Sequence, residues 1–227
     1  MAFELKNVVP WGRSLNEYKL LFNLDDLDLN KKIISFGDGP ASFNSEMHEL
    51  NKVVISIDPI YKFSKKEIEV QITETKFAVI EQMKLNQDSY NWKHIKNIEE
   101  LECIRMGAMN KFLVDFELGR NQKRYIDHEL PELTSYDDLE FDIGLSSHFL
   151  ILYSQLGLDF HLQAITEMLR VAKEVRIFPI LNLSGAKSEV LDDILNHFSK
   201  HFLVNIVSCE YEFQKKGNQM VTIKRKL

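Results

Sequence analysis

Hydrophobic positions along the chain follow two alternating patterns. Short, nearly continuous apolar runs predict buried strands at 33–36, 53–57, 124–126, 141–150, 175–181, 202–209 and 220–223. Apolar residues spaced about every 3.6 positions predict helices at 17–29, 41–50, 98–116, 160–172 and 190–198, and a further helix that begins at Ser64. Strands and helices therefore alternate along most of the chain.

This alternation predicts an α/β fold with one mostly parallel sheet and helices on both faces. The last two predicted strands are separated by the turn signal Gly217-Asn218, so they are expected to form an antiparallel hairpin. Residues 1–30 are expected to form an N-terminal helical cap, and 31–227 a single ligand-binding domain, because no linker interrupts them. Ligands of such sheets bind beyond the carboxyl ends of the strands.

Composition narrows the classes of protein without identifying a reaction. The net charge of −6 argues against a nonspecific nucleic-acid binder, which is normally basic. No apolar run approaches the ~20 residues that a membrane helix needs, and Glu4 and Lys6 interrupt any signal peptide. Cys103 and Cys209 lie far apart, as expected of free thiols in a reducing cytosol. A cytoplasmic protein with neither a nucleic-acid nor a membrane partner is therefore expected.

The first predicted strand runs into the glycine-rich stretch 37–41, Gly-Asp-Gly-Pro-Ala. Glycine permits unusual dihedral angles and lets a ligand approach the backbone closely. A dinucleotide-binding turn has the pattern G-x-G-x-x-G/A, but here the sixth position is Ser42. Small residues at the first, third and fifth positions instead look like the G-x-G-x-G loop of class I S-adenosylmethionine-dependent methyltransferases. A tight turn without a ligand is the alternative.

The second predicted strand ends at Asp58, followed by Pro59. An acidic residue at this place can accept hydrogen bonds from both ribose hydroxyls of a bound nucleoside. The alternative is that Asp58 only caps or forms the turn before the proline. The glycine turn and Asp58 together favour nucleoside binding more than either does alone.

Six stretches extend this similarity over almost the whole chain. They are VPWGRSLNEYKLLFNL, FGDGPASFNSEM, VVISIDPIYKFS, FDIGLSSHFLILYS, FHLQAITEMLRVAKEVRIFPILNL and YEFQKKGNQM. In these stretches the chain resembles a group of bacterial proteins, of undefined substrate, in the class I methyltransferase family. The resemblance implies a Rossmann-like, seven-stranded, mostly parallel sheet with an antiparallel last strand, and S-adenosyl-L-methionine as the cofactor.

The resemblance also implies roles for individual residues. The glycine turn would pass under the methionine part of the cofactor, Asp58 would hold the ribose, and Ser146 would lie near the sulfonium. The loop 127–130 would contact the adenine, and Trp11 and Tyr18 would cover the site. The residues expected to bind the cofactor are Gly37, Asp38, Gly39, Pro40, Asp58, Pro59, Ile60, Leu130, Ser146 and Tyr18.

One position departs from the pattern of the family. Many class I enzymes have an acidic residue two positions before the first glycine, where this chain has Ser35. Asp38, between the glycines, is the candidate to replace that carboxylate.

Methyl transfer from a sulfonium is an in-line displacement, so the enzyme mainly positions the acceptor and excludes water. An acceptor that must lose a proton benefits from a general base. His148 follows the fourth predicted strand and is the candidate base; the alternative is a structural histidine, which is also expected for His161. No group of residues has metal-ligand spacing, so no metal is expected.

Three functions are consistent with these features. The first is an S-adenosylmethionine-dependent methyltransferase with a small-molecule acceptor. The second is a catalytically silent cofactor-binding protein, a sensor or partner subunit, which Ser35 and the uncertain base keep open. The third is a nicotinamide-dependent oxidoreductase, which the glycine spacing and the hairpin ending disfavour. The acceptor and the oligomeric state do not follow from the sequence.

Overall fold

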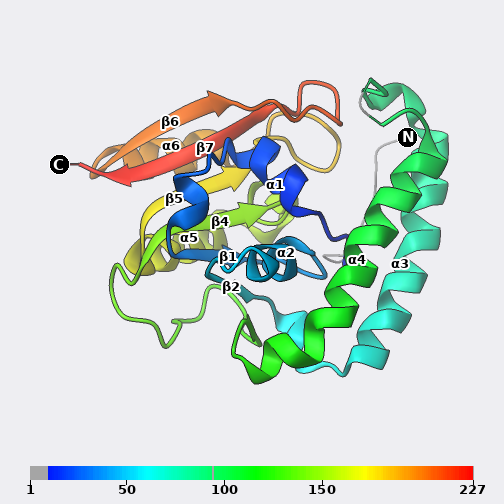
Figure 1. Cartoon of the computed structure of the whole chain (residues 1–227). Helices are drawn as coiled ribbons and strands as arrows, with labels where there is room; N and C mark the ends of the chain where they lie inside the picture. Colours follow the sequence, from blue (N-terminus) through cyan, green and yellow to red (C-terminus); the bar gives the residue numbers. More distant parts are fainter. Residues whose placement is uncertain (1–9, 94, 227) are drawn as a thin grey trace.

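A computed structural model describes residues 10–93 and 95–226. Seven strands form one sheet in the order β3-β2-β1-β4-β5-β7-β6 (Figure 1). The strands are β1 (Ile33–Phe36), β2 (Val54–Ile57), β3 (Tyr125–Ile126), β4 (Phe141–Ser147), β5 (Ala172–Phe178), β6 (Phe202–Ser208) and β7 (Gln219–Arg225). β7 pairs antiparallel with both β5 and β6, and the other pairs are parallel. The predicted fold class and the terminal hairpin are confirmed.

Helices cover both faces of the sheet. The α-helices are α1 (Leu15–Phe22), α2 (Phe43–Glu49), α3 (Lys65–Leu85), α4 (Ile98–Asn121), α5 (Leu158–Val171) and α6 (Leu191–Ser199). Short 3-10 turns are η1 (Asp28–Asn30), η2 (Pro59–Lys62), η3 (Gln87–Ser89) and η4 (Ile151–Leu156).

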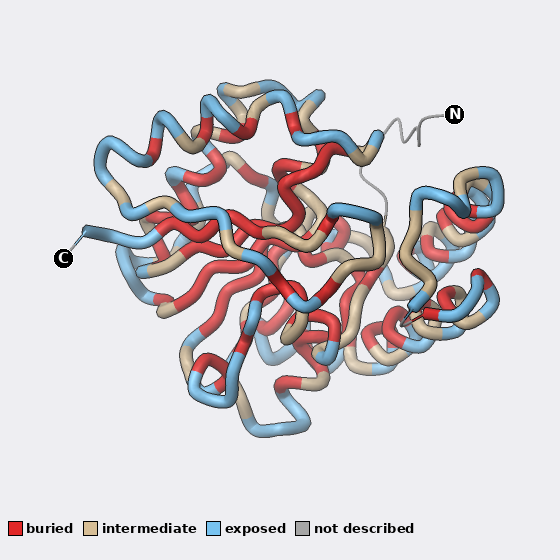
Figure 2. The backbone as a smooth tube through the Cα atoms, turned by 90° about the horizontal axis from the view of Figure 1, so that it is seen from above, coloured by how far each residue is buried: buried red, intermediate tan, exposed pale blue. Residues whose placement is uncertain are grey.

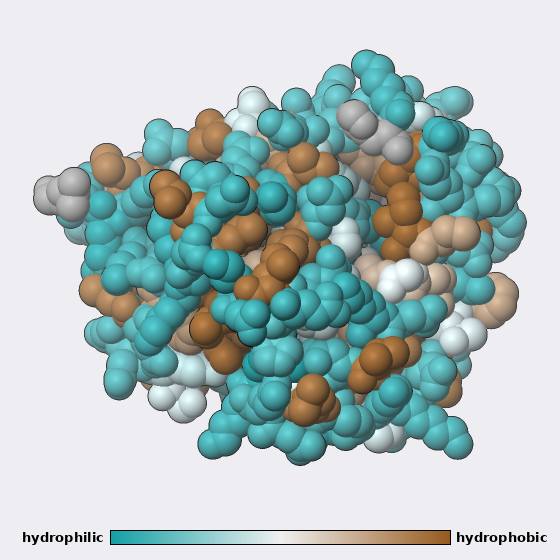
Figure 3. Space-filling model, viewed as in Figure 1, coloured by the Kyte–Doolittle hydropathy of each residue, from teal (hydrophilic) through white to brown (hydrophobic). Residues whose placement is uncertain are grey.

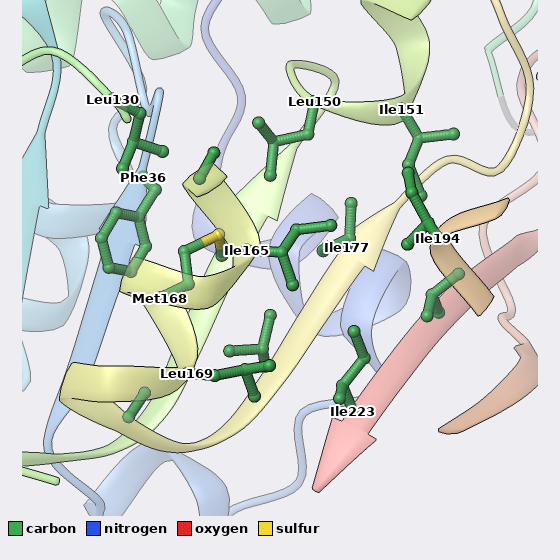
Figure 4. Close-up of a cluster of buried hydrophobic side chains, with 14 of the residues drawn as sticks. Phe36, Leu130, Leu150, Ile151, Ile165, Met168, Leu169, Ile177, Ile194 and Ile223 are labelled. Carbon is green, nitrogen blue, oxygen red and sulfur yellow. The ribbon is translucent and has the colours of Figure 1, made fainter. Parts of the chain in front are cut away.

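Alternate residues of β1 divide the core into two layers. Ile34 and Phe36 pack in one cluster with residues of α5 and α6, where Ile165 and Met168 are buried (Figure 4). Ile33 packs on the opposite face with residues of α1 and α2. Because successive strand residues point to opposite faces, a strand that is apolar throughout must be covered on both sides.

The helix pair α3–α4 stands beside the sheet and buries one side of each helix (Figure 2). A capping box begins α3 at the predicted position: Ser64 Oγ accepts from the Glu67 amide, and the Glu67 carboxylate accepts from the Ser64 amide. The connection between α3 and α4 contacts the β6–β7 loop, where the Asn91 amide donates to the carbonyl of Phe213. Segments that follow opposite edges of the sheet therefore meet across its carboxyl end.

Several predicted element ends differ from the structure. The helix expected at 17–29 stops at Phe22, because Asn23 adopts a left-handed φ of 49° and ends it. The strand expected at 175–181 runs from Ala172 to Phe178, and Pro179 follows in a cis peptide bond. α4 continues to Asn121, beyond the expected end at residue 116. Whether residues 1–30 form a separate cap stays a prediction; in the described part, α1 packs into the core beside α2.

Candidate functional site

A cavity of about 480 Å³ lies at the carboxyl ends of the central strands. Its floor includes Gly37 after β1, Asp58 after β2, His148 after β4 and Pro179 after β5. The α3–α4 pair, residues 10–13 and the β6–β7 loop enclose it. Figure 3 shows hydrophobic side chains gathered where the α3–α4 pair faces the rest of the molecule. This is the place where ligands bind in open α/β sheets.

The glycine turn after β1 requires its glycines for two different reasons. Gly37 and Gly39 have φ values of 63° and 55°, which side chains rarely adopt. A Cβ on Gly37 would lie 2.5 Å from Cδ1 of Phe149, whereas a Cβ on Gly39 would have only Asp58 Oδ2 nearby, at 4.0 Å. Gly37 is thus needed for packing, and Gly39 leaves space on the cavity side of the turn.

Asp38 points back toward the sheet, although it also lines the cavity. Its carboxylate accepts from Ser35 Oγ and Ser56 Oγ, both at 2.5 Å, and from the Tyr18 hydroxyl. Burial raises the pKa of Asp38, and the three hydroxyl donors partly offset that rise. The carboxylate therefore sits against Ser35, the position at which the sequence departs from the acidic residue expected there.

Asp58 lines the cavity and fixes the turn at the same time. Oδ2 accepts from the Gly39 amide at 2.9 Å, and Oδ1 accepts from the Ile60 amide at 2.8 Å. Burial raises the pKa of Asp58 to about 6, and the two amide donors oppose that rise. Both roles weighed for Asp58, turn former and cavity residue, are compatible with its position.

The other predicted cofactor residues separate into two groups. Tyr18, Pro59, Ile60 and Leu130 line the cavity. In the described structure, Pro40 and Ser146 are buried and do not line it, and Ser146 Oγ has no hydrogen-bond partner. Ser147, one residue later, lines the cavity instead.

His148 lies at the cavity wall with a φ of 52°. Its amide donates to the carbonyl of Phe178 at 2.7 Å, and its Nδ1 lies 2.9 Å from Ser147 Oγ. Burial, together with the cationic Arg13 and Arg105, lowers the pKa of His148 well below its usual value. The imidazole is therefore neutral at pH 7 and can accept a proton.

A buried polar cluster beside His148 was not predicted from the sequence. Arg105 of α4 forms an ion pair with Glu17 of α1 and donates to the Tyr211 hydroxyl at 3.0 Å. Arg13 lines the cavity next to this cluster. One signal was available for Arg105, because it falls between Leu101 and Ala108 on the apolar side of its helix.

Other polar candidates have structural roles. The two ring nitrogens of His161 lie 2.6 and 2.9 Å from the carbonyls of Gly157 and Leu150. Asn182, which follows β5, donates to the carboxylate of Glu189 at 2.7 Å. His94 lies outside the described residues. Within residues 10–93 and 95–226, no group of three His, Cys, Asp or Glu is placed to hold a metal ion, and no helix is long and apolar enough to cross a membrane.

The strand order and the antiparallel β7 define the Rossmann-like fold of class I methyltransferases. The mitomycin 7-O-methyltransferase MmcR superimposes with a TM-score of 0.50 and 12% identity over 93% of this chain. This chain spans 54% of MmcR, about half its length. The magnesium protoporphyrin IX methyltransferase of Synechocystis PCC 6803 aligns with a TM-score of 0.47 and 12% identity, over 88% of this chain and 73% of that one. At such identities the likeness shows the fold alone.

The chain belongs to the family of the uncharacterised protein MJ0045 of Methanocaldococcus jannaschii. The two are 37% identical over 223 residues, which cover 97% of this chain and 98% of that protein. No family model matches the chain. The expected restriction of the group to bacteria is not supported, because this relative is archaeal.

Proposed function

We propose that the chain is an S-adenosylmethionine-dependent methyltransferase that acts on a small molecule. The observation that carries this proposal is the cavity at the carboxyl end of the sheet, where the Gly37–Gly39 turn and the Asp58 carboxylate lie side by side. The fold and the methyltransferases that share it support the same conclusion.

The residues of the turn are suited to this cofactor. Each carboxylate oxygen of Asp58 accepts one backbone amide, which leaves a second lone pair on each for the two ribose hydroxyls. Gly39 keeps the main chain open to the methionine part, because little would contact a Cβ there. Pro59, Ile60 and Leu130 supply apolar surface for the adenine.

The bound cofactor would supply a methyl group activated by its positive sulfur. The chain's own contribution is to orient the acceptor, exclude water and remove a proton where the acceptor carries one. His148 serves as the base if Ser147 Oγ accepts the proton of Nδ1, because Nε2 is then the free acceptor. The low pKa of His148 makes it a weak base, which suits an acceptor that is itself readily deprotonated.

Calorimetry with S-adenosylhomocysteine tests cofactor binding. Asp58→Ala is expected to weaken binding by about 1–3 kcal/mol, because a charged hydrogen-bond acceptor is lost. Asp193→Asn, an exposed acidic position on α6, is the control and should bind as the wild type does. Equal affinity of Asp58→Ala and wild type would show that the ribose lies elsewhere.

Turnover is tested separately with isotopically methyl-labelled cofactor and a cell extract, analysed by mass spectrometry. A labelled product that requires wild-type protein and disappears with Asp58→Ala supports the transferase. Cofactor binding without any labelled product would support the silent cofactor-binding protein instead.

A further inference from the structure

Arg13 is a cavity residue whose guanidinium is left without a counter-ion. Its Nη1 donates to the carbonyl of Trp11 at 3.1 Å. Its Nε is buried and has no hydrogen-bond partner. No carboxylate among residues 10–93 and 95–226 forms an ion pair with it. Arg13 as a whole is half-buried, and a partly buried guanidinium that lacks a counter-ion is costly unless a ligand supplies the missing anion.

The carboxylate of Glu17, whose charge acts on Arg13, is already paired. Glu17 pairs with Arg105, whose Nη1 and Nη2 contact Glu17 and the Tyr211 hydroxyl. Two guanidinium groups therefore share one carboxylate, and one positive charge remains unbalanced. Burial and the neighbouring Arg105 together lower the pKa of Arg13 to about 10, as expected for a cation without an adequate partner.

Arg13 lines the cavity together with His148 and Tyr211. Four charged or titratable side chains shift the pKa of Arg13 electrostatically: Arg105, Tyr211, Glu17 and Tyr18. The charge of Arg13 in turn lowers the pKa of His148. Arg13 thus lies among the groups around the candidate base and the β6–β7 loop, and its carbonyl accepts from the Ser42 amide at 3.0 Å, just after the glycine turn.

We propose that Arg13 binds an oxyanion of the methyl acceptor, a carboxylate or phosphate group, and so holds the acceptor beside His148. This inference rests on the proposed function and names the class of substrate. A planar guanidinium donates two parallel hydrogen bonds to such a group, which fixes its orientation as well as its position.

The rest of the acceptor faces apolar walls. Val79 and Met83 of α3 line the cavity, together with Tyr90 and Phe213 at the junction of the α3–α4 connection and the β6–β7 loop. A compact acid with an aromatic or aliphatic body fits both features. A highly polar acceptor, such as a sugar without an acidic group, would leave these walls and Arg13 unmatched.

The test measures whether small anions stabilise the full chain when it is saturated with S-adenosylhomocysteine. The probes are benzoate and inorganic phosphate at millimolar concentration, and the readout is the thermal unfolding midpoint with calorimetric dissociation constants. Wild type is expected to bind at least one probe, and Arg13→Gln to bind it at least tenfold more weakly. Lys66→Gln, an exposed position with the same change of charge, should match the wild type. If Arg13→Gln does not fold, Arg13→Lys is the second variant. It keeps the positive charge but cannot donate two parallel hydrogen bonds, so it should bind the probe severalfold more weakly than the wild type.

A second arm identifies which molecule carries the anion. S-adenosylhomocysteine has a carboxylate of its own, and 5′-methylthioadenosine lacks the amino-acid part. Arg13→Gln could weaken the binding of S-adenosylhomocysteine tenfold and leave the binding of 5′-methylthioadenosine unchanged. In that case the anion belongs to the cofactor, and the acceptor assignment is overturned. The acceptor assignment is also overturned if wild type and Arg13→Gln bind the probes equally well, or if the wild type binds neither probe. Failure of wild type to bind S-adenosylhomocysteine at all would instead refute the proposed function.

Discussion

At the scale of single residues, Asp58 makes cofactor binding sensitive to pH. Burial raises its pKa to about 6, and only the ionised carboxylate can accept from both ribose hydroxyls while it also accepts from the two backbone amides. Bound hydroxyls favour the ionised form, so affinity is full above pH 6 and is lost as the pH falls through that value. We expect the dissociation constant of S-adenosylhomocysteine to rise by up to about tenfold per pH unit below about pH 6.

The matched variant for this prediction is Asp58→Asn, which cannot ionise. Its weaker binding should be nearly independent of pH over the same range, measured by calorimetry in buffers of equal ionic strength. A wild-type affinity that does not change down to about pH 5 would contradict the placement of the ribose on Asp58.

The two glycines of the turn should respond differently to the same substitution. Gly37→Ala brings a methyl group against the Phe149 ring, so we expect it to destabilise the fold by about 1–3 kcal/mol through overpacking, in addition to backbone strain. Gly39→Ala adds strain of about 1–2 kcal/mol without that clash, but its methyl group enters the space of the ligand. Chemical denaturation and calorimetry should therefore separate the larger stability defect at 37 from the affinity defect at 39. The reverse assignment would contradict the geometry of the turn.

A site residue could be predicted from the sequence only where its position is determined by its neighbours along the chain. Gly37 and Gly39 could be found because a turn after a strand restricts backbone angles locally. The contact of Asp38 with Ser56 could not, because those two side chains meet only after β1 and β2 pair. Arg13 had no local signal, since its surroundings come from α1, α4 and the β6–β7 loop.

At the scale of elements, a buried ion pair joins α1 to α4. Burial alone would raise the pKa of Glu17, but Arg105 holds it below its usual value. Removing one partner leaves a buried charge unpaired, so Arg105→Met or Glu17→Gln alone should cost about 3–5 kcal/mol of the free energy of unfolding. The double variant should be closer to wild type than the sum of the two single variants.

Denaturant unfolding of the four proteins measures this coupling as a double-mutant cycle. Additive effects would show that the two side chains act independently.

The type of an element, helix or strand, could be predicted from the spacing of its apolar residues, whereas several helix and strand ends could not. The 3.6-residue period of Ile68, Ile72, Val79 and Met83 indicated α3, and these residues are buried in it. The capping box fixed its start, because both partners are within four residues of each other. The end of α1 at Phe22 depends on the left-handed conformation of Asn23, which leaves little trace in an apolar pattern.

At the scale of the whole molecule, the cavity is closed by contacts between opposite edges of the sheet. Phe213 of the β6–β7 loop stacks on Tyr90 at 5.0 Å and meets Trp92 edge-on at 5.4 Å. The Lys215 amide also donates to the carbonyl of Ser89. These contacts form a bridge between residues 89–92 and 213–215. No sequence pattern predicts it, because its two sides are more than a hundred residues apart.

Phe213→Ala should loosen this bridge and leave the sheet intact. Each lost aromatic pair is worth about 0.5–1.5 kcal/mol, so amides in 86–97 and 209–218 should exchange hydrogen about tenfold faster. Amides of β1 and β4, which lie in the main core, should keep their rates.

Phe77→Ala is the control, because Phe77 is 64% exposed on α3 and lies outside the bridge. Hydrogen exchange followed by mass spectrometry resolves these segments. If the variant exchanged faster throughout the sheet, or in neither segment, the cavity would not be closed by a local bridge that opens independently of the core.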